Sequence, residues 1–127
     1  METRDKPKKI LLIDDDEIFL DIMENMLKAE YEIIQTKSGE EALAYLFKGS
    51  LPSLILLDII MPSMDGWETF NKIKGISLLE NVPIAFMSSL EEAEAEKHAK
   101  ELGAVDFIRK PCEREDLLGR IKAVIKQ

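Results

Sequence analysis

Short apolar segments alternate with segments of helical period along the chain. Five apolar segments have the length and composition of strands: KILLI (Lys9 to Ile13), YEII (Tyr31 to Ile34), LILL (Leu54 to Leu57), IAFM (Ile84 to Met87) and VDFI (Val105 to Ile108). The first, third and fourth are apolar at almost every position, which is typical of strands covered on both faces. We therefore predict a sheet with helices on both sides.

Apolar residues recur every four positions between and after these strands, as expected for helices that bury one stripe. Two such sets are Ile18, Ile22 and Met26, and Leu117, Ile121 and Ile125. Glycines stand where three helical patterns end, and each suits a left-handed residue after a helix: Gly49, Gly75 and Gly103.

Two capping boxes mark where helices should begin. Ser38 is followed by Glu41, and Ser89 is followed by Glu92, the spacing at which the two side chains satisfy free backbone N–H groups. We expect helices to start near residues 39 and 90.

Strand and helix alternate five times without a repeat, a low-complexity segment or a linker. We therefore predict one α/β domain over residues 1–127, with residues 1–7 as a flexible leader. Five such units favour a doubly wound parallel sheet of strand order 2-1-3-4-5, a flavodoxin-like (βα)5 three-layer sandwich.

The charge balance changes the range of expected partners. The chain has 25 acidic and 17 basic residues and a formal charge of −8, which repels a phosphate backbone, so we expect no direct contact with nucleic acid. No apolar segment approaches 18 residues, and the N-terminus has no apolar secretion signal, so we expect a soluble, cytoplasmic protein without membrane contact. The single cysteine, Cys112, cannot form an internal disulfide and fits a reducing compartment.

Polar residues follow four of the predicted strands. In this architecture ligands bind beyond the carboxyl ends of the strands, which meet at one edge of the sheet. The residues at that edge are Asp14, Asp15 and Asp16 after the first strand, Asp58 after the third, Ser88 and Ser89 after the fourth, and Arg109 and Lys110 after the fifth. We expect these side chains to converge.

These residue types favour phosphoryl chemistry. Clustered carboxylates from Asp14, Asp15 and Asp58 repel one another and require a hard divalent cation, for which Mg²⁺ is suited. An aspartate beside such a cation can attack phosphorus and form an acyl phosphate, while a lysine and a hydroxyl contact other phosphoryl oxygens. Asp58, Lys110 and Ser88 supply that set.

Four segments carry a family resemblance. ILLIDDDE, LILLDIIMPSMDG, PIAFMSS and GAVDFIRKP resemble, in order and spacing, the signature blocks of the receiver domain of bacterial two-component response regulators. The resemblance covers roughly Lys8 to Lys126. Any one block is weak evidence, but four in register are highly specific.

The resemblance implies roles for the acidic residues. Asp58 corresponds to the phosphoacceptor, and Asp14 and Asp15 correspond to the acidic pair. In the family the second acid, the phosphoacceptor and a backbone carbonyl two residues further on bind Mg²⁺ directly. Here these are Asp15, Asp58 and Ile60, while Asp14 would act largely through water.

The resemblance also implies a switch. Ser88 matches the switch hydroxyl, Phe107 the switch aromatic, and Lys110 the family's lysine, with a cis bond to Pro111. Ser89 stands where alanine is usual, and phenylalanine at 107 lacks the hydroxyl of the frequent tyrosine. Phosphorylation is expected to alter the surface made by the fourth helix, fifth strand and fifth helix.

The partners follow from the same resemblance. A sensor histidine kinase or a histidine phosphotransfer protein would supply the phosphoryl group, and a phosphorylation-dependent homodimer is an option. The chain would catalyse only its own phosphorylation and dephosphorylation. Ile60 and Leu90 would flank the path of the hydrolytic water, so we expect the acyl phosphate to decay slowly.

The same residues allow other interpretations. The acids at 14–16 could instead cap the following helix. A haloacid-dehalogenase-type phosphatase would carry a second aspartate where Ile60 stands, and a flavin-binding module would not place DDDEIF beside a phosphate. A further interpretation stays open, in which the chain is a degenerate receiver that serves only as a docking module.

Overall fold

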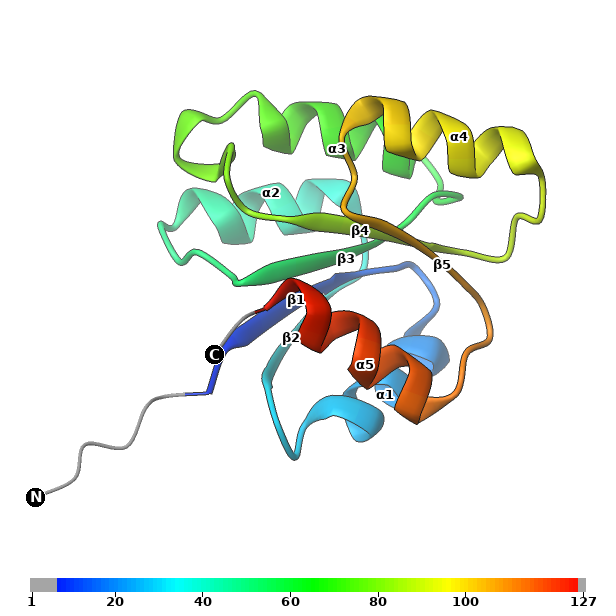
Figure 1. The fold of residues 1–127 in the computed structure, drawn as a ribbon. Helices are drawn as coiled ribbons and strands as arrows, with labels where there is room; N and C mark the ends of the chain where they lie inside the picture. The colour runs from blue at the N-terminus through cyan, green and yellow to red at the C-terminus, as the bar shows by residue number, and fades with distance from the viewer. Residues whose placement is uncertain (1–6, 126–127) are drawn as a thin grey trace, which may run out of the picture.

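The computed structural model describes residues 7–125 around a five-stranded parallel sheet (Figure 1). The strand order β2-β1-β3-β4-β5 confirms the predicted order. The strands are β1 (Lys9–Ile13), β2 (Glu32–Thr36), β3 (Leu54–Asp58), β4 (Ile84–Ser88) and β5 (Asp106–Arg109). The expected leader, residues 1–7, lies outside the described residues except for Pro7.

Within residues 7–125, five α-helices cover the two faces of the sheet. They are α1 (Glu17–Leu27), α2 (Gly39–Phe47), α3 (Gly66–Lys74), α4 (Ala93–Leu102) and α5 (Arg114–Val124), with a short 3₁₀ helix η1 at Ser77–Leu79. Figure 1 shows α1 and α5 on one face and α2, α3 and α4 on the other. The three-layer α/β architecture is thereby confirmed. None of these helices is long and apolar enough to cross a membrane.

The apolar strands divide their side chains between two cores. In β1, Leu11 and Ile13 pack with Phe86 in the core under α2, α3 and α4, whereas Ile10 and Leu12 pack in the core under α1 and α5. Successive residues of a strand point to opposite faces, so a strand buried on both faces must be apolar throughout. This explains the unbroken apolar character of β1, β3 and β4.

The buried side of α1 differs from the predicted stripe. Ile18 is 73% exposed and Ile22 is 46% exposed, whereas Leu20, Met23 and Leu27 are buried. Both sets have helical spacing, so the period alone could not show which set faces the sheet. The stripe predicted in α5 is correct, because all three of its members are buried.

The first capping box forms on one side only, because Ser38 caps α2 while Glu41 accepts the backbone N–H of Lys37 rather than that of Ser38. One of the three glycine predictions is wrong. Ser38 Oγ accepts the backbone N–H of Glu41 at 3.0 Å at the start of α2. Gly49 and Gly103 have left-handed φ angles of 93° and 102°. Gly75 has a φ of −77°, a right-handed conformation open to any residue.

The second capping box is wrong. Helix α4 begins at Ala93, its cap residue is Glu92, and no side chain caps it. Ser88 Oγ, rather than the hydroxyl of Ser89, accepts a backbone N–H, that of Leu90, at 3.0 Å. This bond holds the segment after β4 in a turn, so the helix starts about one turn later than predicted.

Candidate functional site

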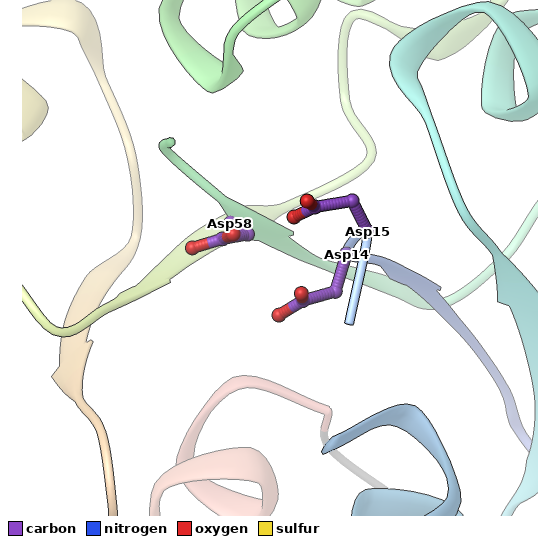
Figure 2. A group of neighbouring side chains, drawn as sticks. All are labelled: Asp14, Asp15 and Asp58. Carbon is purple, nitrogen blue, oxygen red and sulfur yellow. The ribbon is translucent and has the colours of Figure 1, made fainter. Parts of the chain in front are cut away.

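Four of the polar residues predicted at the sheet edge come together, namely Asp14, Asp15, Asp58 and Lys110, whereas Arg109 contacts Leu90 and Glu96 instead. Asp14 follows β1 directly, Asp58 ends β3 and Ser88 ends β4, and these three strands are neighbours in the sheet. Figure 2 shows the carboxylates of Asp14, Asp15 and Asp58 at one place beyond the strand ends. Lys110, which follows β5, reaches the same place through its long side chain.

The three carboxylates are close enough to share one cation. Asp14, Asp15 and Asp58 each offer an oxygen, and the three oxygens lie within 4.8 Å of one another. Asp14 and Asp58 are buried, while Asp15 is exposed. Carboxylates this close repel one another, and a set of hard oxygen ligands suits Mg²⁺. The donor set therefore fits the predicted metal.

Lys110 joins the two buried acids. Its Nζ atom lies 2.6 Å from Asp14 Oδ2 and 3.3 Å from Asp58 Oδ1. Only 17% of its side chain is exposed, so little solvent screens these contacts. The bond between Lys110 and Pro111 is cis, as the resemblance implied.

Asp58 is the site residue with a clearly perturbed acidity. Burial, followed by the nearby charge of Asp14, raises the pKa of Asp58 to about 6. The Lys110 ammonium and the backbone N–H of Ile59 act in the opposite direction and favour the carboxylate. At pH 7 the Asp58 carboxyl is therefore still largely ionised and able to act as a nucleophile.

The three consecutive acids after β1 have different roles. Asp16 Oδ1 accepts two backbone N–H groups in the first turn of α1, at 3.0 and 3.2 Å, so Asp16 is the helix cap. Asp14 Oδ1 accepts the N–H of Asp16 at 2.9 Å, while its other oxygen meets Lys110. The capping interpretation thus holds for Asp16, while Asp14 and Asp15 face Asp58.

The loop after β3 is held tightly against Asp58. Asp65 Oδ1 accepts the backbone N–H of Glu68 at 2.9 Å and caps α3. Gly66 donates its N–H to the carbonyl of Ile59 at 2.7 Å. A Cβ atom on Gly66 would lie 2.2 Å from the carbonyl oxygen of Asp58. Glycine at 66 therefore allows the start of α3 to support the end of β3.

The predicted switch residues, Ser88 and Phe107, lie on the neighbouring strands β4 and β5. Ser88 is 1% exposed, and Phe107 is buried beside Phe86, its partner in the β4–β5 register. Ile60 follows Asp58 by two positions and is 60% exposed. The switch roles of Ser88 and Phe107, and the metal contact of the Ile60 carbonyl, stay predictions.

Two contacts at the site were missed from the sequence. The Nζ atom of Lys110 lies 4.2 Å from the centroid of the Phe19 ring. Arg109 donates to the carbonyl of Leu90 at 3.0 Å and contacts Glu96 at 3.5 Å. Phe19 is the one aromatic residue of α1, and this was the only sequence signal for the first contact. The second contact had no sequence signal.

Comparisons with known proteins agree on one family. The family described as response regulator receiver domain matches residues 10–122. The alkaline phosphatase synthesis transcriptional regulatory protein PhoP of Bacillus subtilis is 31% identical over 94% of this chain and 49% of its own length. Chemotaxis protein CheY4 of Vibrio cholerae is 28% identical with a TM-score of 0.87, covering 94% of this chain and 99% of that one.

A further solved structure covers both chains almost completely. A CheY-like response regulator receiver domain protein from Methanospirillum hungatei is 30% identical with a TM-score of 0.83, covering 93% of each chain. By contrast, the chain spans about half the length of the first curated relatives that it matches.

Proposed function

The chain belongs to the response regulator receiver domain family, and on that premise we propose that Asp58 accepts a phosphoryl group from a histidine kinase or histidine phosphotransfer protein. Receiver domains of this family are signalling units of two-component systems. The observation that carries the proposal is the position of Asp58, a buried carboxylate at the end of β3 beside Asp14, Asp15 and Lys110.

The proposed transfer needs one nucleophile and two groups that stabilise charge. An Asp58 oxygen attacks phosphorus, and the new P–O bond forms as the P–N bond of the donor phosphohistidine breaks. The donor ring, already protonated on its other nitrogen, takes the electron pair of the P–N bond and leaves as neutral imidazole. Lys110 pairs with a phosphoryl oxygen. Because Ser88 Oγ already accepts the N–H of Leu90, its own proton stays available to donate to another oxygen.

We also propose a resident divalent cation, Mg²⁺, at this site. Asp14, Asp15 and Asp58 would hold it, with the backbone carbonyl of Ile60 as a further ligand and Asp14 acting largely through water. The cation supplies positive charge that neutralises the phosphoryl oxygens. The remaining contacts come from Lys110 and Ser88, as described above.

The signal would leave through α4, β5 and α5, where a partner or a second copy of the chain would bind. Phe107 is already buried, so we do not expect its ring to move in from solvent. The segment between Ser88 and α4 is the better route, because Arg109 of β5 holds the carbonyl of Leu90. The effector, the output of any longer protein and a cytoplasmic location stay proposals.

The test is phosphorylation by a small donor. Acetyl phosphate with Mg²⁺ should add one phosphoryl group to the parent chain, seen by intact mass spectrometry. Asp58→Asn should take up none, whereas Asp65→Asn, which alters a cap in the next loop, should be phosphorylated like the parent. Equal uptake by Asp58→Asn would refute the assignment. A parent chain that takes up nothing would favour the docking-only interpretation.

A further inference from the structure

Phe19 forms one wall around the ammonium group of Lys110. The Nζ atom is 4.2 Å from the ring centroid, well inside the roughly 6 Å over which an aromatic face attracts a cation. The same nitrogen lies 2.6 Å from Asp14 and 3.3 Å from Asp58. Lys110 therefore has three neighbours that favour its charge, two carboxylates and one ring face.

Phe19 is held in place by a hydrogen bond to its backbone and by the packing of its ring. Asp16 Oδ1 accepts the backbone N–H of Phe19 at 3.2 Å, which fixes the first turn of α1. The ring also packs on the core under α1 and α5, and it lines a small cavity with Leu20 and Met23. Phe19 is therefore a supported group of the site rather than a free surface side chain.

The proposed reaction makes conflicting demands on Lys110. Asp14 is its closer carboxylate partner, yet the ammonium must shift toward the phosphoryl group when one forms on Asp58. Hydrogen bonds to carboxylates depend strongly on direction, whereas attraction to a ring face is an electrostatic effect spread over the ring. The ring can thus retain the ammonium near Asp58 while one oxygen partner replaces another.

We propose that Phe19 is a positioning residue for Lys110, whose ring holds the ammonium beside Asp58 by cation–π attraction and limits its hydration. This inference rests on the proposed function, because it assumes that Lys110 contacts the phosphoryl group. It assigns Phe19 a part in phosphoryl transfer that is independent of any protein donor.

The test weakens the ring's attraction without changing its shape. Phenylalanines with one, two or three ring fluorines are placed at position 19, and the rate constant for phosphorylation by acetyl phosphate and Mg²⁺ is measured. We expect the rate constant to fall at each step, by about 5- to 20-fold with three fluorines. The same series at Phe47, which is 71% exposed on α2, should leave it unchanged.

Two further measurements separate positioning from a merely structural role. The melting temperature should stay constant across the series, and in a Lys110→Ala background fluorination at 19 should have no effect on the remaining rate. A flat series in a parent chain that is phosphorylated normally would overturn the inference while leaving the proposed function intact.

The contact itself can be tested without any phosphoryl transfer. Proton NMR signals of the Lys110 side chain should be displaced upfield by the ring current, and Phe19→Leu should remove the displacement. Signals that are the same in both proteins would overturn the inference even if phosphorylation is slower in Phe19→Leu.

Discussion

Replacing Asp58 with asparagine should stabilise the metal-free chain at neutral pH. Burial and the charge of Asp14 raise the pKa of Asp58 from 3.8 to about 6. A carboxyl with a higher pKa in the folded state binds its proton more tightly when folded, so folding stability falls as the pH rises from 3.8 to about 6. At ~1.4 kcal/mol per pH unit, this interval corresponds to about 3 kcal/mol.

The free energy of unfolding of Asp58→Asn should therefore exceed that of the parent by up to about 3 kcal/mol above pH 6 and by almost nothing below pH 4. Urea unfolding of both proteins in EDTA, repeated from acid to neutral pH, measures the difference. Glu101→Gln removes an exposed acid of α4 and serves as the surface control. Added Mg²⁺ should reduce the difference in unfolding free energy between Asp58→Asn and the parent, because the cation stabilises the folded parent with its Asp58 carboxylate ionised. A gap that is constant with pH, or that grows toward acid, would refute the reasoning.

Five further outcomes are expected. Mg²⁺ should raise the melting temperature of the parent, and Asp15→Asn should lose most of that rise; an undiminished rise would exclude Asp15 as a ligand. Gly66→Ala should destabilise the chain by about 2 kcal/mol or more, because its Cβ meets the Asp58 carbonyl. Gly119→Ala, whose Cβ meets nothing within 4 Å in α5, should stabilise the chain by about 1 kcal/mol. Urea unfolding measures the change in the free energy of unfolding for both glycine variants, and changes of the same sign would contradict the reasoning. Ile60→Asn should speed decay of the isolated phosphoprotein, since Ile60 offers water no hydrogen bond; an unchanged rate would show that this side chain does not set the lifetime. Phosphorylation should change amide exchange in α4, β5 and α5, and changes confined to α1 would contradict the proposed output face.

Sequence reasoning located the sheet because burial on both faces leaves an unmistakable pattern. The segments that became β1, β3 and β4 are apolar at nearly every position, and these are the three central strands. Each polar residue that ends such a segment must then lie at the carboxyl edge. Asp58 and Ser88 could be placed in the site on this ground alone.

Properties that depend on packing could not be obtained in the same way. Two apolar sets on α1 have helical spacing, and only contact with the sheet decides that Leu20 is buried and Ile18 exposed. Three consecutive aspartates are equivalent in sequence, and only the geometry separates the cap, Asp16, from the acids that face Asp58. The contact between Phe19 and Lys110 joins distant parts of the chain, so no local pattern predicts it.

The described residues begin and end near the edge of the sheet where β3 and β4 start, opposite the edge that carries the acidic cluster. Lys8 and Ile125 line the same groove as Leu51 and Pro83, which precede β3 and β4. A five-residue strand spans about 15 Å, and that length separates this groove from Asp58. A fluorescent protein or a surface anchor joined at either end would therefore leave the phosphoacceptor open to its donor, which makes the chain a convenient core for a phosphorylation biosensor.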